Sequence, residues 1–248
     1  MRFCFIVLLF LFNLFLNLYG EKKVSYDILG YYNDYFAQQK AGKISDVLPY
    51  YEIKKRGKKY YTMSSVDEPI LVIVDIPNGF IEFTDEGTGG GSYRFQMTLF
   101  KAKDERVFLL LNTVEFDGVI EEGKFFVYLF KSGKWESMKD RIFPKIPHEE
   151  LFEKDFYNRN KSKIESFISK YDSERLYVFD LPRYGTDIKV RFKLEAIIDI
   201  LQSQDEFEKM PNTEQKFIKE IQSKIVRDNF LLKWNKDEGK FLFFLLTQ

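Results

Sequence analysis

The sequence predicts an α+β protein dominated by antiparallel β-sheet, with several helices packed on the sheet faces. Aromatic residues make up 18% of the chain, and aromatic side chains suit a pleated, half-buried surface. Many short apolar segments are separated by turn residues, which is typical of antiparallel hairpins. Three longer segments space their apolar residues as helices do. Together these patterns indicate sheet and helix packed in layers.

Helical spacing is found in three places. The expected helices cover residues 26–41, 148–170 and 213–226. Gly42 supplies a stop signal after the first of them, and Pro211 lies just ahead of the third. The second follows Pro147, and its pattern predicts a break near residues 158–160.

Strand patterns fill most of the remaining chain. They lie at residues 50–53, 60–62, 70–75, 93–99, 107–114, 125–131, 176–181, 187–194, 230–234 and 241–245. In the fourth, Tyr93 and Phe95 alternate with Arg94 and Gln96, so we expect one face to be buried and the other to be wet. A glycine-containing turn at residues 54–59 is expected to join the first two strands.

The order of features divides the chain after an N-terminal segment. We expect residues 21–146 to form a β-rich lobe with an N-terminal helix, and residues 147–248 to form an α+β lobe. The order Asp-aliphatic-Pro ends one strand in each lobe, from Asp75 and from Asp180. Two interpretations stay open: the lobes are related by duplication, or β-rich chains simply reuse Pro and Gly around hairpins.

The first twenty residues have the three-part pattern of an export signal. One positive charge at Arg2 precedes an apolar run of 17 residues, and charge resumes at Glu21. Gly20 suits the last position before a signal-peptidase cut, whereas Leu18 is too large for the third-last position. We therefore predict that residues 1–20 are a signal peptide, with an uncleaved N-terminal anchor as the alternative. An exported protein, periplasmic or secreted, is expected in both cases.

Composition excludes several function classes. Removing residues 1–20 takes away one of the 38 basic residues and none of the 38 acidic ones, so the remaining net charge is −1. A nucleic-acid partner is not expected without a basic excess. The single cysteine, Cys4, lies in the export segment, too early to accept a lipid. The mature chain therefore has no disulfide, thiolate metal site or cysteine nucleophile.

No catalytic, cofactor or metal motif is recognised. His148 is the only histidine, and Phe152 stands where a helical zinc site would need a second one. No serine lies in a Gly-x-Ser-x-Gly turn. The glycine-rich residues 87–92 lack the Lys and Ser/Thr of a phosphate loop and lead into a strand, so we interpret them as a hairpin loop.

Two candidate sites are nevertheless open to test. Glu82 and Glu115 are the carboxylates that a hydrolase would use as a pair. Basic charge interleaved with aromatics is the pattern of a surface for an anionic polymer or membrane, although we favour a solvated hairpin tip, because turns are polar for backbone reasons. The candidate binding residues of this second site are Lys54, Lys55, Arg56, Lys58, Lys59 and Tyr60.

From these features we expect a non-enzymatic binding protein of the cell envelope or extracellular space. Its partner would be an envelope protein or a glycan, and membrane contact is expected only if residues 1–20 stay attached. The alternative is a carboxylate-dependent hydrolase of an envelope polymer. The hydrolase predicts a cleft with one carboxyl pKa raised, whereas the binding protein predicts an exposed apolar or aromatic patch.

Overall fold

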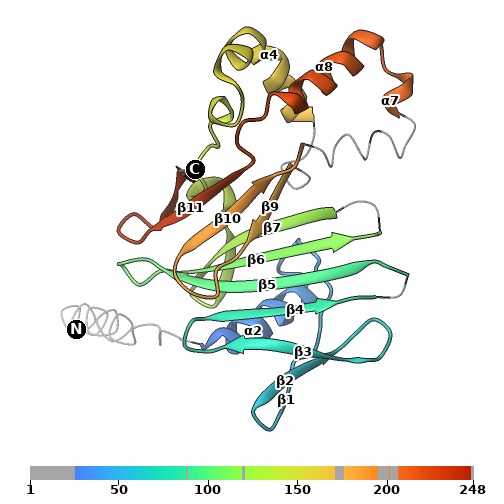
Figure 1. Ribbon diagram of the computed structural model, residues 1–248. Coiled ribbons are helices and arrows are strands. Elements are labelled where there is room, and N and C mark those ends of the chain that lie inside the picture. The colour runs from blue at the N-terminus through green and yellow to red at the C-terminus, as the bar shows by residue number, and fades with distance from the viewer. Residues whose placement is uncertain are drawn as a thin grey trace, which may run out of the picture.

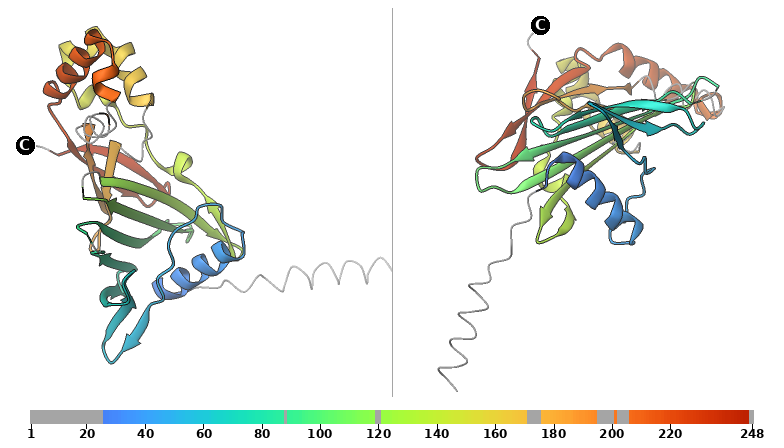
Figure 2. Two further views of the ribbon diagram at one scale, coloured as in Figure 1. Left: turned by 90° about the vertical axis from the view of Figure 1, so that its right-hand side faces the viewer. Right: turned by 90° about the horizontal axis from the view of Figure 1, so that it is seen from below.

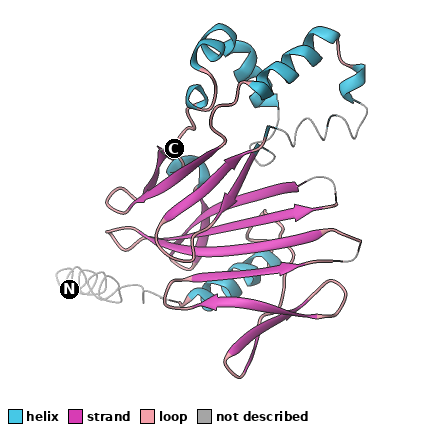
Figure 3. Ribbon diagram, viewed as in Figure 1, coloured by secondary structure: helices cyan, strands magenta, loops and turns pink. Residues whose placement is uncertain are grey.

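The computed structural model describes residues 26–87, 89–118, 121–170, 176–194, 201 and 206–246 (Figure 3). Its helices are α2 (Ile28–Lys40), α3 (Lys139–Ile142), the 3-10 helix η1 (His148–Glu150), α4 (Lys154–Lys170), α7 (Glu206–Lys209) and α8 (Asn212–Ser223). Its strands are β1 (Lys54–Arg56), β2 (Lys59–Met63), β3 (Pro69–Asp75), β4 (Phe80–Asp85), β5 (Ser92–Lys101), β6 (Val107–Phe116), β7 (Glu121–Lys131), β8 (Lys134–Ser137), β9 (Tyr177–Asp180), β10 (Asp187–Phe192), β11 (Asn229–Asn235) and β12 (Lys240–Leu245). The predicted signal peptide at residues 1–20 lies outside the described residues.

The described strands form two antiparallel sheets. The larger sheet holds β1 to β8 in chain order, and the smaller sheet has the order β12-β11-β10-β9. Figure 1 shows the meander of the larger sheet, with α4, α7 and α8 at one end of the molecule and the β1–β2 hairpin at the other. The predicted α+β class with predominantly antiparallel strands is confirmed.

Helix α2 covers one face of the larger sheet. Asp27 caps it by accepting a hydrogen bond of 2.8 Å from the amide of Gly30. Its buried stripe includes Tyr32, Tyr35 and Phe36, which pack with inward-facing residues of β4 to β7. Each aromatic side chain removed from water in this way stabilises the fold by about 1.5–3 kcal/mol. The predicted helix at residues 26–41 is confirmed.

The smaller sheet covers part of the opposite face. Figure 2 shows α2 on one side of the larger sheet and the smaller sheet on the other. The two sheets share one hydrophobic core, in which the rings of Phe125 and Phe179 stack with centroids 4.2 Å apart. Ile164 of α4 and Ile218 of α8 pack into the same core. The predicted boundary between residues 146 and 147 falls, along the chain, between the two sheets.

The prediction of one wet face on β5 is wrong. Gln96 is 1% exposed and Thr98 is 3% exposed, although both lie on the face that the alternation assigns to water. The cause is the smaller sheet: the side chain of Asn112, which is the cross-strand neighbour of Gln96, donates a hydrogen bond of 2.8 Å to the carbonyl of Phe179. Alternation of apolar and polar residues identifies the apolar face of a strand. It does not show whether a second sheet covers the polar face through hydrogen bonds.

Two other local predictions need correction. The helix over residues 148–170 breaks at residues 151–153, not at 158–160, because this segment pairs with residues 224–227: the carbonyl of Leu151 accepts hydrogen bonds from the amides of Val226 and Arg227. Residues 54–59 are not one long turn either. They belong to β1 and β2, with only Gly57 and Lys58 between the strands and Gly57 at φ +63.

The two Asp-aliphatic-Pro turns meet in space. Asp75 ends β3 and Asp180 ends β9, and each turn leads into a hairpin. Arg183, just after the second turn, donates a hydrogen bond of 2.8 Å to the carboxylate of Asp75. The turns therefore tie the two sheets together, and a duplication of the lobes stays a prediction. None of the helices within the described residues is long and apolar enough to cross a bilayer.

Candidate functional site

The predicted binding residues lie on the β1–β2 hairpin. The side chains of Lys54, Lys55, Arg56, Lys58 and Lys59 are all exposed, and Tyr60 is half-buried. Strand β1 pairs only with β2, so the hairpin forms an edge of the larger sheet, and it projects from one end of the molecule (Figure 1). The ammonium of Lys55 lies 5.5 Å from the centroid of the Tyr60 ring. The structure therefore brings these six residues together on one projecting hairpin.

One face of this hairpin continues onto β3, and it is basic on the hairpin and apolar on β3. We call it the hairpin face, and its residues on one side of β1 to β3 are Lys54, Arg56, Lys59, Tyr61, Met63, Pro69, Leu71 and Ile73. It lies on the side of the larger sheet that the smaller sheet covers farther along, at Gln96 and Asn112. Leu71 is 53% exposed, whereas Val72 on the opposite side is 3% exposed. The smaller sheet therefore leaves this part of the face open.

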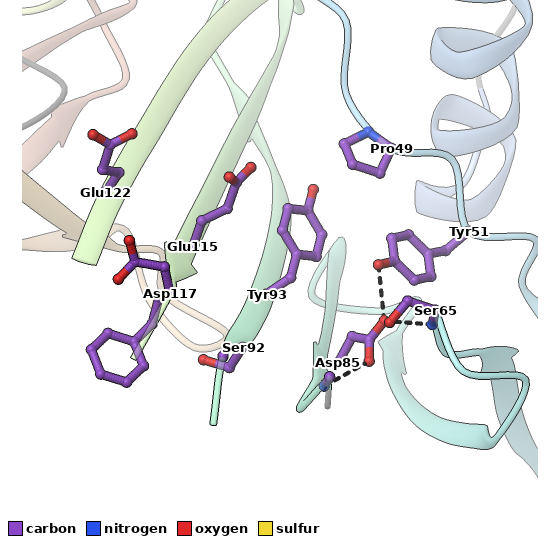
Figure 4. Close-up of a pocket in the computed structure, with 12 residues that line it drawn as sticks. Pro49, Tyr51, Ser65, Asp85, Ser92, Tyr93, Glu115, Asp117 and Glu122 are labelled. Carbon is purple, nitrogen blue, oxygen red and sulfur yellow. Dashed lines mark hydrogen bonds between the residues drawn. The ribbon is translucent and has the colours of Figure 1, made fainter. Parts of the chain in front are cut away.

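A pocket lies at the opposite end of the strands, on the α2 side of the larger sheet. We call it the Tyr93 pocket. It has a volume of about 470 Å³ and is lined by Pro49, Tyr51, Ser65, Asp85, Gly87, Gly91, Ser92, Tyr93, Glu115, Phe116, Asp117 and Glu122. Figure 4 shows Tyr51, Asp85 and Ser65 on one side, Glu115, Asp117 and Glu122 on the other, and Tyr93 between them. The volume falls in the range of small-molecule sites.

Four of the lining residues form a single row across the sheet. Asp85 of β4 lies directly opposite Tyr93 of β5. Tyr93 lies opposite Glu115 of β6, and Glu115 lies opposite Glu122 of β7. Residues that are directly opposite in antiparallel strands point to the same face. The meander therefore places three carboxylates and one phenol side by side, although they lie on four strands.

Asp85 holds the wall of the pocket in place. Its carboxylate accepts hydrogen bonds from the amides of Ser65 at 2.8 Å and Gly87 at 3.1 Å, and from the hydroxyl of Tyr51 at 3.1 Å. Burial opposes its ionisation, but these hydrogen bonds outweigh burial and lower the pKa of Asp85. Asp85 is therefore a fixed anion that positions Tyr51.

The two tyrosines form the aromatic part of the wall. The rings of Tyr51 and Tyr93 stack, with centroids 5.7 Å apart and an angle of 11° between their planes. Burial raises the pKa of Tyr51 to about 12, and burial also raises the pKa of Tyr93. Both phenols are therefore neutral at physiological pH. The hydroxyl oxygen of Tyr93 is buried and has no hydrogen-bond partner.

All charged residues among the described lining residues are acidic. Glu115 is 3.9 Å from the ammonium of Lys124, which lies outside the lining. Carboxylates directly opposite each other on one face, as Glu115 and Glu122 are, repel and destabilise a sheet. Among the described residues, no group of three or more His, Cys, Asp or Glu side chains is arranged to hold a metal ion. Acidic side chains beside two tyrosine rings suit an organic cation with an apolar or ring-shaped body.

The carboxylate pair suggested by the sequence is not brought together. Glu82 is the cross-strand partner of Gln96 and faces the smaller sheet, whereas Glu115 faces the α2 side. Glu82 is also bound by Arg94, at 2.6 Å. Two groups on opposite faces of a sheet cannot act on one glycosidic bond. Among the described residues, the carboxyl groups with shifted pKa values, Asp75, Asp85, Asp104 and Glu165, are all shifted downward.

His148 belongs to a cluster that joins three elements. Its Nδ1 lies 3.0 Å from Glu165 of α4, its Nε2 lies 3.0 Å from the hydroxyl of Tyr177 of β9, and Tyr157 donates to Glu165 at 2.6 Å. The order phenol, imidazole, carboxylate resembles a nucleophile triad. Tyr177 is only 4% exposed, however, so no substrate reaches its oxygen. The cluster fixes η1 against α4 and β9.

The pocket was missed at the sequence level because its residues are far apart in the chain. The signal that would have found it is register: the hairpin loops determine which residues pair, and pairing puts Asp85, Tyr93, Glu115 and Glu122 in one row. Of these four residues, the sequence indicates only Glu115 as a candidate, and pairs it with Glu82, which lies on the other face.

No family model matches the sequence, and no curated protein is significantly similar to it. Among solved structures, the chain is similar to a domain of an uncharacterized protein from Porphyromonas gingivalis W83. The two share 13% sequence identity, with a TM-score of 0.45 over 84% of this chain and 87% of that chain.

Proposed function

We propose that this protein is an exported binding protein without catalytic activity, and that its Tyr93 pocket holds a positively charged, amine-bearing component of the cell envelope or extracellular space. The observation behind the proposal is the row of Asp85, Tyr93, Glu115 and Glu122 in a pocket of about 470 Å³. Export is supported by the sequence pattern of residues 1–20.

The chemistry of the row favours a cation. Of the described residues that line the pocket, four are acidic and none is basic, and an ammonium group is attracted to several carboxylates at once. The stacked rings of Tyr51 and Tyr93 offer an apolar surface for the body of the ligand.

Amines and their fully N-acetylated counterparts, in which no ammonium charge remains, test the proposal. Glucosamine, lysine and cadaverine are compared with their N-acetylated counterparts by NMR titration at low salt. We expect each amine to bind at least about tenfold more tightly than its acetylated counterpart, because acetylation removes the charge. Added salt should weaken amine binding in proportion to screening.

Variants then locate the binding. Glu115→Gln should weaken amine binding several-fold, because it removes one charge of the row without changing side-chain size. Glu136→Gln on β8, an exposed residue outside the pocket, is the matched control and should bind as the parent does. Equal binding of amines and acetylated forms, or no effect of Glu115→Gln, would show the proposal to be wrong.

A further inference from the structure

Strand β3 is apolar on both faces, yet only one face is covered. Its residues alternate between sides, so that Val72 packs toward α2 while Pro69, Leu71 and Ile73 point to the open side. Leu71 is 53% exposed and Ile73 is 36% exposed, and Met63 of the neighbouring strand is 44% exposed. Apolar side chains that are exposed together on one face mark an interaction surface.

Cations lie beside this apolar surface, on the strands β1 and β2 that form the free edge of the sheet. Lys54, Arg56 and Lys59 lie on the hairpin face itself, and Lys55 and Lys58 complete the hairpin. The guanidinium of Arg56 lies 5.9 Å from the Tyr61 ring, so the aromatic residue links the charged and apolar parts. Charge and apolar area therefore occur on the same projecting edge.

Acidic groups near this surface are few or paired. Glu52 forms an ion pair of 2.9 Å with Lys54, and both side chains are well exposed, so this pair is weak in water. Asp75, at the end of β3, pairs with Arg183. Asp67 and Glu68 lie in the turn after β2, at the other end of that strand from Gly57. The hairpin therefore presents an excess of positive charge to a partner.

We propose that the hairpin face is a docking surface for an anionic lipid bilayer. Cationic side chains are attracted to acidic headgroups, and apolar side chains on the same edge enter the boundary between headgroups and acyl chains. This contact does not require residues 1–20 to remain attached, and it is independent of the Tyr93 pocket.

The combination of groups favours a bilayer over an acidic polymer. An acidic polymer such as polyglutamate is attracted to the cations, but it offers no apolar phase in which Leu71 and Ile73 could be buried. A bilayer interface offers a partner for both kinds of group. Lysine stems can also lie along the apolar boundary while their ammonium groups reach the phosphates.

The test compares variants of the exported protein, recovered from cells and identified by mass, in a vesicle sedimentation assay. Vesicles of phosphatidylglycerol mixed with phosphatidylcholine are compared with phosphatidylcholine alone. The charge variant replaces Lys54, Arg56 and Lys59 by glutamine, and the apolar variant replaces Leu71 and Ile73 by serine. We expect the charge variant to lose about a hundredfold in partitioning, at about fivefold for each charge. The apolar variant should lose about tenfold or more.

A charge-matched control carries glutamine at Lys154, Lys209 and Lys216, which are exposed on helices at the other end of the molecule. It should bind vesicles as the parent does, and unchanged circular dichroism verifies that each variant is folded. A label at Leu71→Cys should report an apolar environment only with anionic vesicles. Equal partitioning of the control and charge variants overturns the proposal. Undiminished binding of the apolar variant also overturns it. A preference for polyglutamate over vesicles overturns it too, and would assign the hairpin face to an acidic polymer.

Discussion

Two regions on the same side of the larger sheet have opposite relations to water. Under the smaller sheet, the side carries Gln96 and Asn112, which are polar and at most 1% exposed. On β1 to β3, it carries Leu71 and Ile73, which are apolar and at least 36% exposed. A folding requirement alone would place these residue types the other way round. The polar residues therefore serve contact with the smaller sheet, whereas the apolar residues are available to the external partner proposed above.

The covered region shows how polar groups align two sheets. Asn112 donates to Phe179 O at 2.8 Å, Gln96 accepts from the amide of Leu181 at 3.2 Å, and Arg94 reaches Asp180 at 2.9 Å. Apolar contact between sheets tolerates sliding, but each of these hydrogen bonds requires one relative position. Gln96 and Asn112 therefore specify the docking geometry that buries Phe125 and Phe179.

The largest effect should come from the apolar part of the covered region. Phe125→Ala removes a ring that is 1% exposed and stacks on Phe179. We expect the free energy of unfolding to fall by about 3–5 kcal/mol, because transfer and cavity terms add. Urea denaturation measures it. A loss below about 1 kcal/mol would mean that the smaller sheet is not firmly packed on the larger one.

The polar part of the covered region should respond less strongly. Asn112→Ala should lower the free energy of unfolding by about 1–3 kcal/mol, because the carbonyl of Phe179 is left buried without its donor. Combining it with Gln96→Ala gives a double-mutant cycle, in which we expect a coupling of about 0.5–3 kcal/mol. Strict additivity would contradict a shared network, since the amide of Asn112 donates to Gln96 at 3.1 Å.

The boundary between the regions should be sensitive to acid. The hydrogen bond from Arg183 is the largest cause that lowers the pKa of Asp75, followed by the hydrogen bond from Asn78. A carboxyl with a lowered pKa in the folded state stabilises it above the unfolded value of about 3.9 and loses this effect as pH falls through the folded value. NMR titration should therefore find a pKa for Asp75 below the ordinary value of an aspartate. Arg183→Gln should move its pKa back up, and an unmoved value would exclude the pairing.

The smallest effect on stability should come from the uncovered region. Leu71→Thr replaces a half-exposed side chain by another good strand former, and we expect a change in the free energy of unfolding within about 0.5 kcal/mol. The measurement is the same urea denaturation used for Phe125→Ala. A loss comparable to that of Phe125→Ala would mean that Leu71 belongs to the folding core, and the contrast between the regions would disappear.

Local sequence patterns predict the helices and strands of this fold better than they predict what packs against each of them. Periodicity placed α2 and α8 to within a few residues, and ten of the strands lie at or next to the expected segments. β4 was overlooked because Phe80 and Ile81 are adjacent apolar residues that interrupt a simple alternation, and α7 because it is only one turn long. Local spacing reports backbone geometry, so it identifies elements well.

Which surfaces are covered, and which residues meet, depends on contacts between segments that are distant in the chain. The row of Asp85, Tyr93, Glu115 and Glu122 arises from the register of three successive hairpins. The burial of Gln96 and Asn112 arises from contacts with residues that lie 67 to 85 positions later in the chain. The basic hairpin was visible in the sequence, because its charges are consecutive. Its apolar neighbour Leu71 was not distinguishable from a core residue, because a single chain pattern shows that a side chain is apolar and not whether anything packs on it.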